Sequence, residues 1–101
     1  MKDKSNLPPE DLERAEEALY QAVTCLRTVG ECRDFFRDLC TPAELQALID
    51  RWTVVGLLRE GLTYREISAR TGVSVTTIGR VARFLTDGFG GYQTVVERLD
   101  H

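Results

Sequence analysis

The chain has 101 residues, of which 43% are hydrophobic and 29% are charged, a balance typical of one soluble globular domain. No apolar run is long enough to cross a membrane, and the start of the sequence holds no apolar signal segment, so we expect a cytoplasmic protein. The three cysteines lack a CxxC spacing and the single histidine is the last residue, His101, which leaves a zinc site short of ligands. We therefore expect reduced thiols, no metal and no cofactor.

Charge is divided unevenly along the chain. Residues 1–50 carry six basic and eleven acidic side chains, a net charge of −5, and residues 84–101 carry −2. Residues 51–83 carry six arginines against two glutamates, a net charge of +4. One basic segment in an otherwise acidic chain is typical of a surface that faces DNA, although each arginine taken singly can also be an ordinary solvated side chain.

The N-terminal part predicts a disordered tail over residues 1–6, followed by a single helical domain over residues 7–101. The first helix is predicted to begin at residues 8–9, both proline, and to run to about Val29, where Gly30 ends it. Its apolar residues form one stripe that needs another helix to cover it, from this chain or from a second subunit. The stripe consists of Leu12, Ala15, Leu19, Ala22, Val23 and Leu26.

Two more helices are predicted before the basic segment. The first is short and covers residues 31–39. The second has a strong start signal, with Thr41 as N-cap, Pro42 at the first helical position and Glu44 completing a capping box. It is predicted to run to about Glu60. The residues expected to face inward are Leu45, Leu48, Ile49, Trp52, Val55 and Leu58.

Residues 63–86 predict two short helices joined by a tight turn. Thr63 and Glu66 form a capping box for the first helix, and Gly72 suits the left-handed conformation that ends it. Ser74 is the N-cap of the second helix. The apolar residues that recur at helical spacing on this second helix are Ile78, Val81, Ala82 and Leu85.

This arrangement is typical of a helix-turn-helix, in which the second helix lies in the DNA major groove. Its small and hydroxyl residues are expected to approach bases, and the arginines are expected mostly to hold phosphates. The predicted DNA-binding residues are Arg65, Arg70, Ser74, Thr76, Thr77, Gly79, Arg80 and Arg83. The alternative is a plain helical hairpin with a glycine at its corner.

A last amphipathic helix is predicted over Tyr92–Leu99, after a glycine-rich corner. No alternating strand pattern and no internal repeat occur in the sequence, so the predicted fold is all-α with about six helices. The glycine-rich corner follows a helix rather than a strand, and no nucleophile has an evident base. We therefore do not expect an enzyme.

The run LCTPAELQALIDRWTVVGLLREGLTYREISARTGVSVTTIGRVARFL, with the glycine-rich corner and short helix after it, resembles the Trp repressor superfamily. The likeness is closest to the YerC/YecD-type, TrpR-related DNA-binding proteins. It covers about Leu12 to Leu99, and its more specific segments are Thr-Pro-x-Glu, YREI, TGVS and TIGRV. The resemblance implies a Trp-repressor-like intertwined homodimer, in which the N-terminal helices of two chains form one core, with double-stranded DNA as partner.

The resemblance also implies a ligand site. In Trp repressor the corepressor indole lies between two arginines, which Arg51 and Arg80 match by position, and Thr41 matches a ligand-proximal backbone position. Val81 and Phe84 stand where that protein has a glycine and a serine, so larger apolar side chains are expected to fill space and remove a polar contact. Tryptophan is therefore not the expected corepressor, and the identity of any other effector stays open. In the alternative, both arginines serve structure or DNA binding.

The leading hypothesis from the sequence is a dimeric, sequence-specific transcriptional regulator, expected to be a repressor, that reads DNA with its helix-turn-helix. The alternative is a protein-interaction module that keeps the same fold without reading DNA. The modest charge of +4 over the basic segment favours this alternative. Salt-sensitive binding to duplex DNA separates the two hypotheses.

Overall fold

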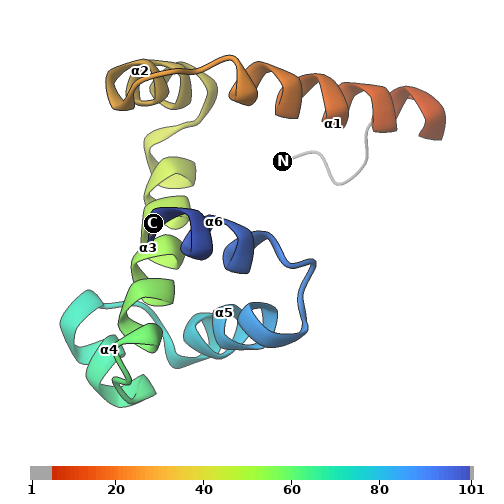
Figure 1. The fold of residues 1–101 in the computed structure, drawn as a ribbon. Helices are drawn as coiled ribbons and strands as arrows, with labels where there is room; N and C mark the ends of the chain where they lie inside the picture. The colour runs from red at the N-terminus through yellow and green to blue at the C-terminus, as the bar shows by residue number, and fades with distance from the viewer. Residues whose placement is uncertain (1–5, 101) are drawn as a thin grey trace. The chain divides into compact units, whose positions relative to one another are not determined.

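The computed structural model describes residues 6–100, and within them the chain forms six α-helices and no strand (Figure 1). The helices are α1 (Pro9–Thr24), α2 (Val29–Leu39), α3 (Pro42–Arg59), α4 (Tyr64–Thr71), α5 (Val75–Asp87) and α6 (Gly91–Leu99). This confirms the predicted all-α fold. The tail predicted over residues 1–6 lies outside the described residues, except for Asn6. The helices divide into two compact units between Thr41 and Pro42.

In the first unit, α1 ends earlier than predicted, at Thr24, and Gly30 lies inside α2 instead of ending α1. The reason is a second helix start signal, which lies where the apolar pattern predicts one continuous helix. Thr28 is the N-cap of α2, and its Oγ1 accepts the backbone N–H of Glu31 at 3.0 Å. The Glu31 Oε1 atom in turn accepts the N–H of Arg27 at 2.8 Å. These hydrogen bonds fix a break in the chain before α2.

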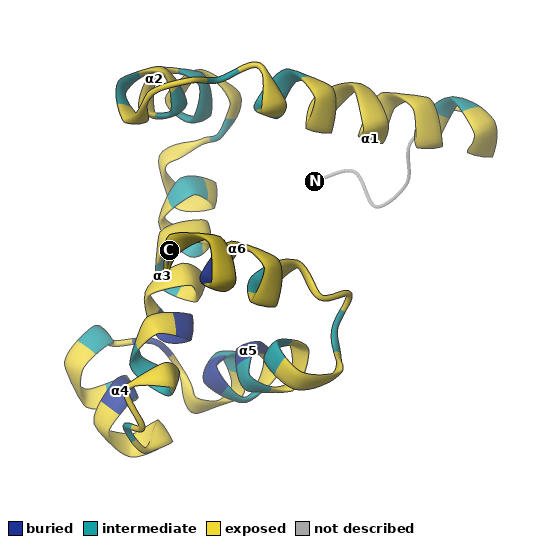
Figure 2. Ribbon diagram, in the orientation of Figure 1, coloured by how far each residue is buried: buried dark blue, intermediate teal, exposed yellow. Residues whose placement is uncertain are grey.

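Neither α1 nor α2 contributes to a core. No residue in the described range 6–41 is buried, and Figure 2 shows both helices mostly in the colour of exposed residues. Leu12 and Leu19, both in the predicted stripe, are 40% and 38% exposed. The rings of Phe35 and Phe36 contact each other edge to face, with centroids 5.6 Å apart. The apolar face of α1 is therefore largely exposed in the single chain.

The second unit is built around a small apolar core to which each of its four helices contributes. Helices α3, α4 and α5 contact one another, and α6 contacts α5. The ribbon is dark blue at the buried residues in Figure 2. They are Val54, Val55, Ile67, Val73, Ile78, Val81 and Val96. This core holds α4 and α5, the predicted helix-turn-helix, in one fixed arrangement.

The inward face predicted for α3 is only partly correct. Val55 is buried and Leu58 packs against the core, but Val54 is fully buried and was not predicted. Conversely, Ile49 and Trp52 are 48% and 41% exposed. Leu48 is exposed to a similar degree. Only the C-terminal half of α3 contributes buried side chains to this unit, so the apolar residues of its first half stay on the surface.

Helix α6 begins at Gly91, one residue before the predicted start, and buries Val96. The glycine-rich corner before it has two constraints. A Cβ at Gly88 would collide with the carbonyl oxygen of Phe84, and Gly90 has φ +83°, a conformation that favours glycine. At the other end of α6, the carboxylate of Asp100 forms a 2.7 Å ion pair with the Arg59 guanidinium. This pair is exposed, so it stabilises the fold by about 0–1 kcal/mol.

Candidate functional site

The first helix of the motif, α4, starts with the predicted capping box. Thr63 Oγ1 accepts the N–H of Glu66 at 3.2 Å, and Glu66 Oε1 accepts the N–H of Thr63 at 2.9 Å. The hydrogen bond that the Thr63 backbone N–H donates to the Glu66 carboxylate, and after it a hydrogen bond from the Thr63 side chain, hold the pKa of Glu66 below its ordinary value. The box fixes Tyr64, the first residue of α4, and one turn later Ile67 is fully buried in the core.

The turn between the two helices has the geometry that the sequence predicts. Gly72 adopts the left-handed conformation, with φ 78° and ψ 0°, and its N–H donates to the Ser68 carbonyl at 2.8 Å. Thr71 Oγ1 donates to the carbonyl of Ile67 at 2.7 Å and accepts the N–H of Val73 at 3.1 Å. Val73 is buried and closes the corner. The turn is therefore fixed by both backbone and side-chain hydrogen bonds.

The second helix, α5, begins at Val75, as predicted, and Ser74 is its N-cap. Ser74 Oγ accepts the N–H of Thr77 at 3.2 Å and donates to Thr77 Oγ1 at 3.1 Å. Further along α5, Ile78 is fully buried and Val81 nearly so. These contacts fix which face of α5 is turned away from the core.

Most of the predicted DNA-binding residues lie on the surface. Those that are exposed are Arg65, Arg70, Ser74, Thr76, Arg80 and Arg83. Among the described residues, none forms a hydrogen bond or ion pair with any of the four arginine side chains in this set. The guanidinium groups are thus available to an anionic ligand, and the N-terminal turn of α5 beside them carries small polar side chains.

Thr77 and Gly79 are half-buried. Thr77 lines a hollow beside α5. Gly79 lies against the ring of Tyr64, because a Cβ added at Gly79 would be 3.9 Å from Tyr64 Cε2. No sequence pattern singles out Tyr64, because a contact between two helices leaves no pattern in either helix.

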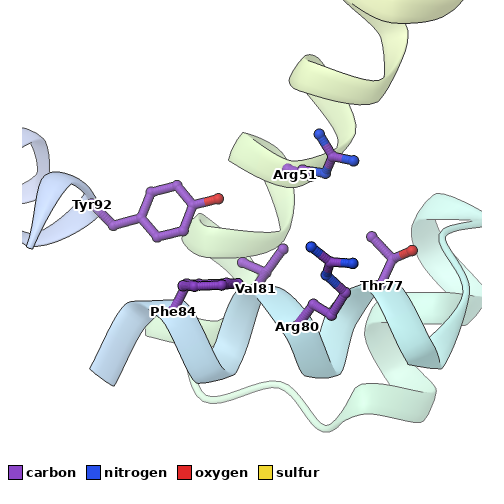
Figure 3. Close-up of a pocket in the computed structure, with 6 residues that line it drawn as sticks. All are labelled: Arg51, Thr77, Arg80, Val81, Phe84 and Tyr92. Carbon is purple, nitrogen blue, oxygen red and sulfur yellow. The ribbon is translucent and has the colours of Figure 1, made fainter. Parts of the chain in front are cut away.

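The hollow has a volume of about 290 Å³ and brings together the two arginines that the resemblance matches to a ligand site (Figure 3). Arg51 comes from α3 and Arg80 from α5, and Figure 3 shows their guanidinium groups at one end of the hollow. The rings of Phe84 and Tyr92 lie at the other end. The complete lining is Arg51, Thr77, Arg80, Val81, Phe84 and Tyr92.

The lining gives this hollow a positive and an apolar end. No acidic side chain lines it, and no described residue pairs with either guanidinium. Phe84 contributes an apolar wall, as predicted, and is 41% exposed. Tyr92 was not predicted; its ring also contacts Trp52, with centroids 6.3 Å apart. Thr41, the third residue matched to a ligand site, belongs to the other compact unit.

Within residues 6–100, no helix is both long and apolar enough to span a bilayer. The same residues contain no cluster of three or more side chains suited to holding a metal ion. The arginine-bearing surface of α4 and α5 and the hollow beside it are the candidate sites that the sequence also indicates.

Comparison with known proteins places these features in a family. The family model described as Trp repressor protein matches residues 15–100. The chain is 41% identical over 83 residues to the uncharacterised protein YerC of Bacillus subtilis (strain 168), covering 82% of this chain and 80% of that protein.

Two solved structures have a TM-score of 0.81 with this chain. One is a TrpR-like protein from Eubacterium eligens ATCC 27750, at 45% identity, covering 86% of this chain and 90% of that one. The other is a putative Trp repressor from Staphylococcus aureus, at 35% identity, covering 94% and 96%. With a family match over most of its length and relatives this similar, the chain belongs to the Trp repressor family and is of the YerC type.

Proposed function

We propose that this protein is a dimeric, cytoplasmic transcriptional regulator that reads a specific DNA sequence and acts as a repressor. The observation that carries the proposal is the α4–α5 pair, a helix-turn-helix with arginines that no described residue pairs with. This pair lies in the only basic stretch of an acidic chain, because residues 51–83 carry a net charge of +4. Acidic surfaces elsewhere disfavour other docking orientations.

In the proposed complex, α5 lies in the major groove and α4 crosses the phosphate backbone, as in other helix-turn-helix proteins. Thr76 and the partly covered Thr77 and Gly79 are on the turns of α5 that approach base edges. Small side chains permit a close approach at these positions. Arg65, Arg70, Arg80 and Arg83 are assigned to phosphates, with base edges within reach of the last two.

A second copy of the chain is the proposed partner for the uncovered apolar faces. The stripe of α1 has no covering helix among the described residues, and none of residues 6–41 is buried. In the other unit, Trp52 on α3 and Val95 and Leu99 on α6 are 41%, 45% and 70% exposed. Burying such faces in one shared core stabilises a dimer. Two reading helices fixed by that core would bind half-sites one helical turn apart, about 34–36 Å.

We further propose that tryptophan is not a corepressor of this protein. Phe84 and Tyr92 already form an aromatic end in the hollow beside Arg51 and Arg80, which leaves less room for an indole. The two arginines then support α5 or bind DNA without a ligand between them. Calorimetric titration of the full chain with tryptophan is expected to show no binding at micromolar concentration, and heat of binding at that concentration would overturn this part of the proposal.

DNA binding itself is tested with a labelled duplex at two salt concentrations. If the four assigned arginines of each subunit hold phosphates, the affinity should fall by a factor of about 10³ or more between 50 and 200 mM salt. Arg83→Glu should abolish binding to the labelled duplex. Arg37→Glu, a matched change on exposed α2, should leave that binding intact. An absence of salt-sensitive binding would reject this proposal and support the interaction module.

A further inference from the structure

Tyr64 is a surface aromatic residue to which the proposed function assigns no role. It is the first residue of α4, and the capping box of Thr63 and Glu66 fixes the backbone on either side of it. The residue is 44% exposed although its side chain is large and mostly apolar. No described residue forms a hydrogen bond with its hydroxyl group. The phenol is thus held in place, and its hydroxyl has no hydrogen-bond partner within residues 6–100.

The ring of Tyr64 lies on α5, the helix proposed to enter the groove. Its Cε2 atom would be 3.9 Å from a Cβ added at Gly79, so the ring is seated on a helix position that has no side chain. Arg80 follows Gly79 directly, and Arg65 follows Tyr64. At interfaces, a tyrosine typically packs its aromatic ring against protein while its hydroxyl group forms a hydrogen bond with the partner molecule.

We propose that the Tyr64 hydroxyl donates a hydrogen bond to a DNA phosphate, with the ring seated on Gly79 holding this contact in register with α5. This inference rests on the proposed DNA-binding function and adds a contact residue to it. In helix-turn-helix complexes the first helix crosses the backbone while the second enters the groove, so a residue at the start of α4 meets a phosphate and not a base edge.

A tyrosine contact differs from an arginine contact in one measurable way. The phenol is a neutral donor, so forming its hydrogen bond neutralises no phosphate and releases no counterion. Removing it should therefore lower the affinity without changing the slope of affinity against salt. A guanidinium contact contributes to both the affinity and the slope.

The experiment compares Tyr64→Phe with the unchanged full chain, by titrating labelled duplexes of several sequences over a range of salt concentrations. The substitution removes only the hydroxyl and keeps the ring on Gly79. We expect affinity for each duplex to fall about tenfold for each subunit that binds, the scale of one hydrogen bond to a charged group. The salt slope, the order of preference among duplexes and the thermal midpoint should not change. The control is Tyr20→Phe, in α1, where the hydroxyl donates to Glu16 at 2.7 Å.

The outcomes test the phosphate contact of Tyr64 separately from the proposed DNA-binding function. If the unchanged chain binds DNA and Tyr64→Phe binds equally well, the inference is overturned and the DNA-binding function stands. A loss confined to one duplex sequence would mean a base contact, and a lowered thermal midpoint would mean a structural role; both overturn the assigned phosphate contact. If the unchanged chain binds no duplex at any salt concentration, the function and the inference fail together.

Discussion

Replacing Gly79 by alanine should make the protein more stable. Gly79 is in the interior of α5 and does not have a positive φ, so alanine can adopt its conformation. The new Cβ would be 3.9 Å from Tyr64 Cε2, an ordinary van der Waals distance, so the ring need not move. Alanine is favoured over glycine in a helix interior by about 1 kcal/mol. The free energy of unfolding should therefore rise by about 0.5–1 kcal/mol, and the thermal midpoint by about 3–6 °C.

The same methyl group should weaken DNA binding. If α5 lies in the major groove, an added methyl group near its N-terminal turns keeps the helix backbone away from the bases. The expected loss is about tenfold, the scale of one base contact. The substitution thus changes stability and affinity in opposite directions, which general destabilisation cannot do.

The assay is thermal and urea unfolding together with titration of a labelled duplex. Gly56→Ala is the control, because Gly56 is an exposed residue of α3 and a Cβ there meets nothing within 4 Å. It should gain similar stability and leave DNA affinity unchanged. A less stable Gly79→Ala variant would refute the packing of Tyr64 on Gly79. An unchanged affinity would refute the proposed placement of α5.

Three further predictions concern the turn, the capping box and a phosphate contact. Gly72→Ala should lower the free energy of unfolding by about 1–2 kcal/mol in urea titrations, because φ is 78° there and the cost is conformational; equal stability would contradict this. The lowered pKa of Glu66, caused by hydrogen bonds from Thr63, means that its contribution to stability is present near neutral pH. That contribution to stability is lost as the pH falls from about 4.3 through the lower pKa that Glu66 has in the folded state. In thermal scans, the Glu66→Ala variant should lack this pH-dependent loss of stability. Arg83→Ala should weaken binding to all duplexes and reduce the salt slope by about 0.9 for each of the two subunits, so an unchanged slope would argue against a phosphate contact.

The local signals of the helix-turn-helix were predictable because each acts within a few residues. The capping box of Thr63 and Glu66, the left-handed Gly72 and the Ser74 cap depend on backbone groups no more than four positions away. Residues that act at this range leave a pattern in the sequence. The same kind of signal at Thr28 was missed, since the apolar stripe continues beyond it and favours one longer helix.

Contacts between helices were not predictable from one sequence. Helical spacing on α3 predicts that Trp52 lies in the core or at an interface, but the core of the single chain takes Val54, and only the positions of α4 and α5 decide between these faces. Likewise, the ring of Tyr64 meets Gly79 fifteen positions later, and Tyr92 reaches the hollow from α6. The residue pattern of one helix does not indicate which residue of another helix it contacts.

The most direct test of the central claim is selection of binding sites from a random duplex library, at about 0.1 M salt, with sequencing after each round. For the proposed dimeric regulator, we expect enrichment of one palindromic motif, without added tryptophan, with half-sites about one helical turn apart. That result would establish a dimeric protein that reads sequence and would also supply the operator. Enrichment of no sequence, with and without tryptophan or a metabolite pool, would contradict the account.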